Sequence, residues 1–175
     1  MKKGVQEPPF RFVNALASDV IPKSMMAIIE EELRAECLSG GLAGYPLMDI
    51  QATLLSAEYR EGESNEQAYR FAVAQAVRSA LASAGANILE PIMKLEVVSP
   101  EDYLGEITSD LGSRRAMIEG MGMRGHLRVI TARVPLREMF GYSTMLRSLS
   151  QGRATYSMEP LQYETAPEEV SKQMM

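Results

Sequence analysis

The first half of the chain has hydrophobic positions spaced for two strands and two helices. Residues 10–13 and 47–55 alternate polar and apolar side chains, which predicts a strand in each range. Between them, apolar residues at steps of three and four predict one face of a helix that begins near Pro22 and ends at Gly40-Gly41. The residues of this face are Met26, Ile29, Leu33 and Cys37.

A second helix is expected from about residue 64 to residue 83, after a polar loop at residues 56–63. Ser64 with Gln67 three residues later is typical of a capping box, and Gly85 favours a helix stop. Small side chains recur along this helix at helical spacing and predict a face that packs closely against a sheet. They are Ala68, Ala72, Ala76, Ser79 and Ser83.

The second half of the chain predicts the order strand, helix, strand, strand, helix, strand. The expected strands are residues 92–98, 116–121, 127–134 and 153–158. The first helix begins at Pro100 and stops near Gly112, and the second begins at Pro135 or Leu136 and ends at Gly152. This βαββαβ order is that of the ferredoxin-like fold.

Together the two halves predict an α+β protein of two small domains, residues 1–88 and 89–175, with a frayed tail after Pro167. Gly141 lies inside the last predicted helix, where a glycine costs about 1 kcal/mol relative to alanine. We expect tight packing against a neighbouring element to be the reason for a glycine there.

The composition is that of a folded, water-soluble protein. Hydrophobic residues make up 46% and charged residues 23% of 175, and no apolar run approaches the ~20 residues that span a bilayer. Two lysines near the N-terminus precede no hydrophobic segment, so we expect no secretory signal. The single cysteine excludes an intramolecular disulfide and suits a reducing, cytoplasmic location.

The net charge of −5 is unevenly distributed along the chain. Residues 1–90 hold 8 basic and 12 acidic residues, whereas residues 111–153 hold 8 arginines against Glu119 and Glu138. Arginine suits bidentate contacts with phosphate, so the second segment is a candidate nucleic-acid surface. The alternative is a set of solvated arginines in local ion pairs.

No arrangement typical of catalysis or of metal binding stands out. Gly120-x-Gly122-x-x-Gly125 resembles a dinucleotide fingerprint, but a strand follows it where that motif needs a helix, so a hairpin turn is predicted. His126, the only histidine, is expected to be exposed beside this hairpin, without a nucleophile motif. The 13 methionines are better explained by packing than by an adaptable binding surface.

Several stretches of the sequence point to a known family. The longest is residues 134–156, Val-Pro-Leu-Arg-Glu-Met-Phe-Gly-Tyr-Ser-Thr-Met-Leu-Arg-Ser-Leu-Ser-Gln-Gly-Arg-Ala-Thr-Tyr. Shorter ones are Leu-Glu-Pro-Ile-Met at 89–93, Ser-Pro-Glu at 99–101, the pair Arg114-Arg115, Val-Ile-Pro at 20–22 and Leu-Ala-Gly-Tyr-Pro at 42–46. Together they resemble the fourth and fifth domains of elongation factor G over nearly the whole chain.

The resemblance implies a part of a ribosomal translocase. The fourth domain of this family acts as a tRNA mimic, which enters the A site of the small ribosomal subunit to act on the tRNA–mRNA duplex. The fifth contacts large-subunit rRNA near the stalk base. GTP and Mg²⁺ belong to the family's first domain, which is absent here, so the resemblance implies no cofactor, small-molecule substrate or membrane partner for this chain.

The resemblance also assigns candidate contact residues. The tRNA-facing tip comprises Arg60, Glu61, Gly62, Glu63 and Ser64. The candidate rRNA contacts are Arg114, Arg115, Arg147 and Arg153.

The sequence departs from the family pattern at two places. The family usually has Tyr-His-x-x-Asp-Ser at this tip, where this chain has Tyr59, Arg60, Glu63 and Ser64. The glycine-rich first tip loop and its flanking strands should precede Phe10, so an incomplete ribosomal-protein-S5-like α/β domain with an exposed sheet edge is expected. The alternatives to translocation are a recycling or ribosome-protection paralogue, or a plain protein-interaction module.

Overall fold

The structure, a computed structural model, describes residues 10–17, 20–40, 44–85 and 87–174. It divides into two compact units, Met1–Ala86 (unit 1) and Asn87–Met175 (unit 2). The predicted α+β class is confirmed, because each unit combines helices with a sheet. Within the described residues, no helix is both long and apolar enough to cross a membrane. Residues 1–9, Gly41 and the start of the motif at 42–46 lie outside the described residues.

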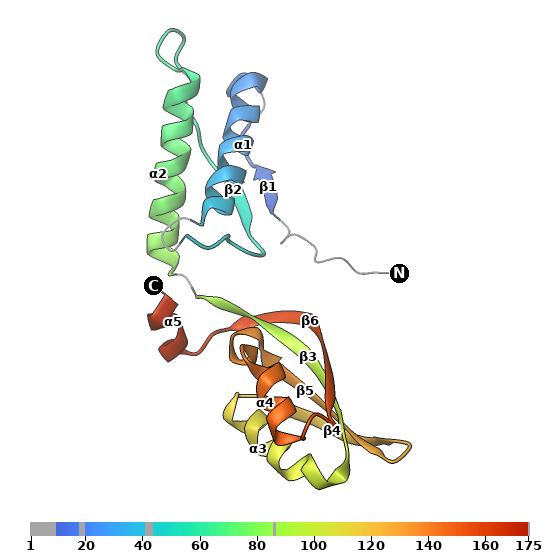
Figure 1. Ribbon diagram of the computed structural model, residues 1–175. Coiled ribbons are helices and arrows are strands. Elements are labelled where there is room, and N and C mark those ends of the chain that lie inside the picture. The colour runs from blue at the N-terminus through green and yellow to red at the C-terminus, as the bar shows by residue number, and fades with distance from the viewer. Residues whose placement is uncertain (1–9, 18–19, 41–43, 86, 175) are drawn as a thin grey trace. The chain divides into compact units, whose positions relative to one another are not determined.

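Unit 1 is a two-stranded parallel sheet with two long helices (Figure 1). Strand β1 (Arg11–Asn14) pairs with β2 (Gln51–Leu54), and α1 (Lys23–Ser39) connects them. A loop then leads to α2 (Glu66–Ala84). As predicted, α1 begins after Pro22 and stops at Gly40, whose left-handed φ of 87° ends the helix.

The second strand is shorter than predicted. The sequence predicts extended structure over residues 47–55, but the ladder to β1 begins only at Gln51. Asp49 has a left-handed φ of 54°, which extended backbone does not allow. The strand therefore starts after this residue.

The predictions for the packing and the capping of α2 are both wrong. Its small side chains at positions 68, 72, 76, 79 and 83 are exposed, and α2 packs through Tyr69, Val73 and Val77 instead. Burying larger side chains removes more apolar area from water, so these residues decide the face. The N-cap is Asn65, whose Oδ1 accepts a hydrogen bond from the Ala68 N–H at 2.9 Å.

An ion-pair cluster joins the two helices of unit 1. Arg70 on α2 donates to Glu32 at 2.7 Å and to Glu31 at 3.0 Å, both on α1, and to Glu66 at 2.9 Å. These bonds raise the pKa of the Arg70 guanidinium above its ordinary value. One guanidinium of α2 thus bonds to two carboxylates of α1 and links the two helices.

Unit 2 is a four-stranded antiparallel sheet with two helices on one face (Figure 1). The strands β3 (Leu89–Ser99), β4 (Met117–Arg124), β5 (Leu127–Pro135) and β6 (Thr155–Thr165) lie in the order β4-β5-β3-β6. The helices are α3 (Leu104–Ser113), preceded by the 3-10 turn η1 (Glu101–Tyr103), and α4 (Tyr142–Leu149), preceded by η2 (Leu136–Met139). The predicted ferredoxin-like order is confirmed.

The core of unit 2 draws buried side chains from the two central strands β3 and β5, from α3 and α4, and from the turn η2. It contains Met93, Leu95, Val97, Ile107, Leu111, Ile130, Val134, Met139, Tyr142 and Leu146. Alternate residues of β3 pair with alternate residues of β5, as in Leu95 opposite Ala132 and Val97 opposite Ile130, so one face of the sheet is apolar.

Three details of unit 2 differ from the sequence prediction. Strand β6 runs to Thr165, seven residues beyond the predicted end. The tail after Pro167 is not frayed, because residues 168–174 form α5 (Glu168–Met174). Strand β4 continues through Gly120 and Gly122 to Arg124, and the predicted hairpin turns at Gly125 and His126. His126 is exposed, as expected.

Gly141 does not lie inside a continuous helix. It adopts a left-handed φ of 73° and separates η2 from α4. A Cβ added at Gly141 would meet no atom within 4 Å, so the predicted tight packing is wrong. The backbone conformation, which glycine reaches without a steric penalty, is the reason for this residue.

Candidate nucleic-acid interface

The predicted tip is a compact loop between β2 and α2 in unit 1. The Arg60 N–H donates to Ser64 Oγ at 2.9 Å, and the Ser64 N–H donates back to the Arg60 carbonyl oxygen at 2.9 Å. Gly62 supplies the left-handed turn with a φ of 82°. The Tyr69 hydroxyl of α2 donates to the Glu58 carbonyl oxygen at 2.7 Å and ties the loop to the helix. The five predicted tip residues thus form one closed turn.

The tip carries more negative than positive charge. The Arg60 side chain is 70% exposed and lies 3.4 Å from Glu58 and 3.7 Å from Glu63. Glu61 is exposed beside them. Exposed ion pairs of this kind contribute about 0–1 kcal/mol, so the Arg60 guanidinium is released to another anion at little cost.

Arg114 is largely enclosed by its own unit. Its Nε donates to Asp110 at 2.8 Å, and its Nη1 donates to the carbonyl oxygen of Glu138. The guanidinium lies 5.1 Å from the centre of the Tyr142 ring. These contacts tie the end of α3 to the turn before α4.

Arg115 is held by carboxylates of its own unit. It makes two hydrogen bonds to Glu90, at 2.6 and 3.3 Å, and lies 3.6 Å from Glu138. The bonds to Glu90 raise the pKa of the Arg115 guanidinium above its ordinary value. Glu90 is only 4% exposed, so it depends on this partner.

Arg147 and Arg153 differ from this pair. Both side chains are exposed, and neither makes a hydrogen bond or ion pair with the described residues. They flank the turn that ends α4, where the Gly152 N–H donates to the Arg147 carbonyl oxygen at 2.8 Å. The structure thus brings these two cations to one end of α4, where the helix dipole favours positive charge.

Several arginines of the basic segment 111–153 are paired in the fold with carboxylates from outside the segment. Arg124 pairs with Glu96 at 3.0 Å, Arg128 with Glu101 at 2.6 Å, and Arg133 with Glu164 at 3.3 Å. Each of these carboxylates lies outside the segment. The predicted alternative of local ion pairs therefore describes several of the eight arginines.

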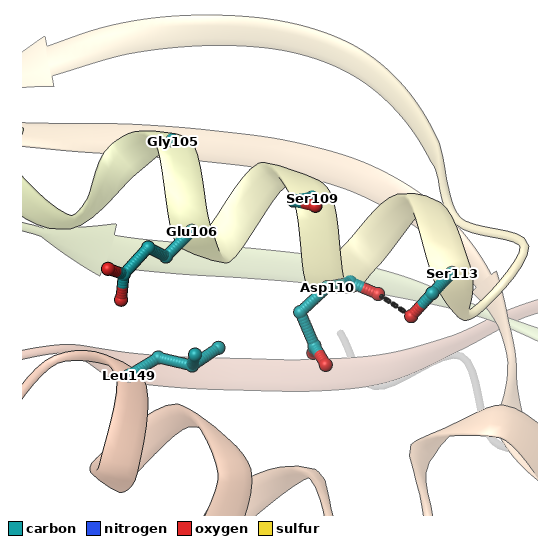
Figure 2. A pocket seen from close by; sticks show the side chains of 6 residues that line it. All are labelled: Gly105, Glu106, Ser109, Asp110, Ser113 and Leu149. Carbon is teal, nitrogen blue, oxygen red and sulfur yellow. Dashed lines mark hydrogen bonds between the residues drawn. The ribbon is translucent and has the colours of Figure 1, made fainter.

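An open pocket of about 470 Å³ lies between α3 and the end of α4 (Figure 2). Its lining residues are Gly105, Glu106, Ser109, Asp110, Ser113 and Leu149. Figure 2 shows the Ser113 hydroxyl bonded to the Asp110 carbonyl oxygen, at 2.7 Å. This lining contains no histidine or cysteine, and the described residues hold no cluster of three His, Cys, Asp or Glu side chains that suits a metal ion.

Two family models match the chain, one for each unit. The model described as elongation factor G, domain IV matches residues 2–85, and the model described as elongation factor G C-terminus matches residues 87–174.

Curated relatives and a solved structure agree with these matches. Elongation factor G of Fervidobacterium nodosum is 50% identical, and that of Thermotoga maritima 46% identical, over 95% of this chain and 24% of each relative. The chain therefore spans about a quarter of the length of these relatives. A crystal structure of a Thermus thermophilus protein matches with a TM-score of 0.82 at 33% identity, over 94% of this chain and 25% of the other.

Proposed function

The chain belongs to the elongation factor G family, and from this premise we propose that it acts in translation elongation by contacting the ribosome. In this proposal unit 1 presents its tip to the tRNA–mRNA duplex in the A site of the small ribosomal subunit, as a tRNA mimic that promotes translocation. Unit 2 contacts large-subunit rRNA near the stalk base. The mechanism is steric and electrostatic.

The tip loop supports the first part of the proposal. Its turn is closed by reciprocal bonds between Arg60 and Ser64 and is fixed to α2 by Tyr69. A loop ordered in this way loses little further entropy on contact. In the proposed contact, Arg60 exchanges its weak ion pairs with Glu58 and Glu63 for an RNA phosphate. The carboxylates of Glu61 and Glu63 accept hydrogen bonds from donor groups of the RNA.

The observation that carries the second part is the pair of arginines at the end of α4. Arg147 and Arg153 are exposed and make no ion pair within the described residues, so contact with phosphate breaks no interaction of the fold. Arg114 and Arg115 are instead bonded to carboxylates of their own unit, Asp110 and Glu90, which compensate their charge within the fold. Of the four predicted rRNA contacts, Arg147 and Arg153 are therefore the stronger assignment.

We propose no covalent chemistry for this chain. GTP hydrolysis with Mg²⁺ is assigned to a separate GTPase domain of the full-length factor, and the site of action is cytoplasmic. A recycling or ribosome-protection role is the alternative, and it uses the same surfaces at a different step. A translocation assay with the full-length factor separates these roles, because only a translocase advances the tRNA–mRNA duplex.

Co-sedimentation with bacterial ribosomes over a salt series tests the RNA contact. Each phosphate contact changes the slope of log affinity against log salt by about 1. We expect Arg147→Ala and Arg153→Ala each to reduce the slope by about 1. Arg78→Ala is the control, because Arg78 is also exposed without an ion pair in the described residues, but lies on α2. Unchanged slopes in both unit 2 variants would refute the rRNA assignment.

A further inference from the structure

The hydroxyl group of Tyr69 is not needed for the packing of unit 1. Tyr69 is 9% exposed and belongs to the buried apolar cluster of this unit, together with Ile29 and Val73. A phenylalanine ring would fill the same space and would bring no polar group that needs a partner in the core. The Tyr69 hydroxyl donates instead to the carbonyl oxygen of Glu58 at 2.7 Å, eleven residues earlier in the chain. Its partner thus lies in the loop that leads to the tip.

The segment that enters the tip, residues 55–59, has few other attachments to unit 1. It follows the last residue of β2, Leu54, and its side chains are exposed except that of Ala57, which packs against the apolar cluster. Among the described residues, no backbone hydrogen bond joins this segment to another part of the unit. The bond from Tyr69 is the one hydrogen bond between described residues that joins it to a helix.

The turn at residues 60–64 is closed within itself. Arg60 and Ser64 bond to each other in both directions, and Asn65 immediately caps α2. These bonds fix the shape of the turn and attach its C-terminal end to the helix. Its N-terminal end depends on residues 55–59, so the Tyr69 bond to Glu58 controls the orientation of Arg60, two residues later.

The helix that carries Tyr69 is itself attached to α1. Arg70, the next residue, bonds to Glu31 and Glu32 of α1 and to Glu66 in the first turn of α2. The beginning of α2 is therefore linked to α1 by ion pairs as well as by the apolar cluster. Tyr69 thus holds the loop from a part of the unit that has a defined position.

We propose that Tyr69 is a positioning residue for the RNA contact of the tip, whose hydroxyl holds the Glu58 carbonyl oxygen so that an ordered loop presents the Arg60 guanidinium to a phosphate. Tyr69 itself is buried and does not touch the RNA. The RNA contact of Arg60 rests on the proposed function, whereas the role of Tyr69 rests on its bond to the loop. Loss of the hydroxyl lowers the fraction of molecules with an ordered loop, and the apparent affinity falls with that fraction.

Binding of the 175-residue chain to small ribosomal subunits that carry mRNA and tRNA, measured over a salt series, tests this inference. We expect Tyr69→Phe to weaken binding about two- to tenfold, the factor that corresponds to the net contribution of one hydrogen bond. The factor should be the same at every salt concentration, because the phosphate contact still forms in the bound state. Arg60→Ala, which removes the contact itself, should instead reduce the slope of log affinity against log salt by about 1.

Val73→Ala is the matched control for a general loosening of unit 1. Val73 is buried one turn further along α2, in the same apolar cluster as Tyr69. Its truncation leaves a cavity and should lower the unfolding midpoint at least as much as Tyr69→Phe does. Because the bond to Glu58 is retained, Val73→Ala should bind as wild type. Thermal unfolding of each variant establishes that it is folded at the assay temperature.

A double variant tests whether Tyr69 acts through Arg60. Ordering of the loop affects binding only as far as the RNA distinguishes the ordered loop from the released one. Without the Arg60 guanidinium this difference is largely lost, so adding Tyr69→Phe to Arg60→Ala should cause little further loss of affinity. Losses that add in full would show that Tyr69 does not act through Arg60 and would overturn the inference.

The outcomes separate this inference from the proposed function. Weaker binding of Arg60→Ala with wild-type affinity of Tyr69→Phe overturns the positioning role and leaves the proposed function standing. Equal losses in Tyr69→Phe and Val73→Ala also overturn it, because unit 1 as a whole is then loosened. Wild-type affinity of Arg60→Ala refutes the proposed tip contact and with it the role of Tyr69. Absence of wild-type binding even at about 50 mM salt, where phosphate contacts are strong, refutes both.

Discussion

The ion pair between Arg115 and Glu90 provides a quantitative test of the fold of unit 2. Arg115 follows α3 at the position where helices usually end in glycine, with a left-handed φ of 60°. The Ala116 N–H donates to the Leu111 carbonyl oxygen at 3.0 Å and closes this helix end. An arginine is placed there despite the backbone strain, and its guanidinium reaches the buried Glu90 at 2.6 Å. We infer that neutralising Glu90 outweighs the strain.

The burial of the ion pair sets the expected loss of unfolding free energy for each variant. Removing one partner of a buried ion pair costs about 3–5 kcal/mol because the other charge stays buried. The Arg115 side chain is 36% exposed, so water reaches the pair and we expect the lower end, about 3 kcal/mol, for Arg115→Ala. Arg115→Gly loses the same ion pair but relieves about 1 kcal/mol of left-handed strain, so it should cost about 2 kcal/mol.

The assay is calorimetric unfolding of the two variants, with amide exchange in β3 and β5 identifying the transition of unit 2. One kcal/mol shifts the midpoint of a 60–100-residue domain by about 4–8 °C, so Arg115→Ala should lower it by about 12–24 °C. The glycine variant should melt above the alanine variant. Equal midpoints would refute the strain argument, and a loss below about 0.5 kcal/mol in either variant would mean that the pair behaves as a surface salt bridge.

Three further predictions concern single residues. Gly141→Ala should destabilise unit 2 by about 1–2 kcal/mol through its left-handed φ alone, since an added Cβ meets no atom within 4 Å. Gly112→Ala, in the regular helix α3, should stabilise unit 2 by up to about 1 kcal/mol. Urea unfolding of both variants gives the sign of each change in the free energy of unfolding. Asn65→Ala should cost about 1 kcal/mol because the first turn of α2 loses its cap, and Asn65→Asp should restore stability; equal loss in both variants would exclude the cap as the cause. Burial, and secondarily the Glu36 charge, raises the pKa of the Cys37 thiol above its ordinary value, so the folded state binds this proton more tightly than the unfolded state. The resulting stability is complete below the unfolded pKa and declines as pH rises above it, and Cys37→Ala should remove this alkaline decline in a pH series of unfolding midpoints.

Local signals in the sequence were enough for most of the elements and for the topology of unit 2. Apolar spacing predicted α1, with Ile29 and Cys37 buried, and Pro22 and Gly40 predicted its ends. Such features act within a few residues, so they can be interpreted without the rest of the chain. The ferredoxin-like order followed from the sequence of elements, since few arrangements bury four strands and two helices of this order.

Features that depend on distant partners were decided by the tertiary structure. The sequence offered small residues as the packing face of α2, but Tyr69 and Val73 bury more apolar area against α1. Gly141 was predicted inside a helix because the sequence shows the spacing of the apolar residues around it but not its left-handed φ. The four candidate arginines looked equivalent in sequence.

In the fold, two of these arginines are held by the chain itself. Arg114 and Arg115 bond to groups on other elements, including Glu138 and Glu90, which lie 24 and 25 residues away, whereas Arg147 and Arg153 find no carboxylate within the described residues. The sequence determined which residues carry the charge. Only the tertiary structure decided which charges are already neutralised, because an ion pair depends on distance in space, which residue spacing does not specify.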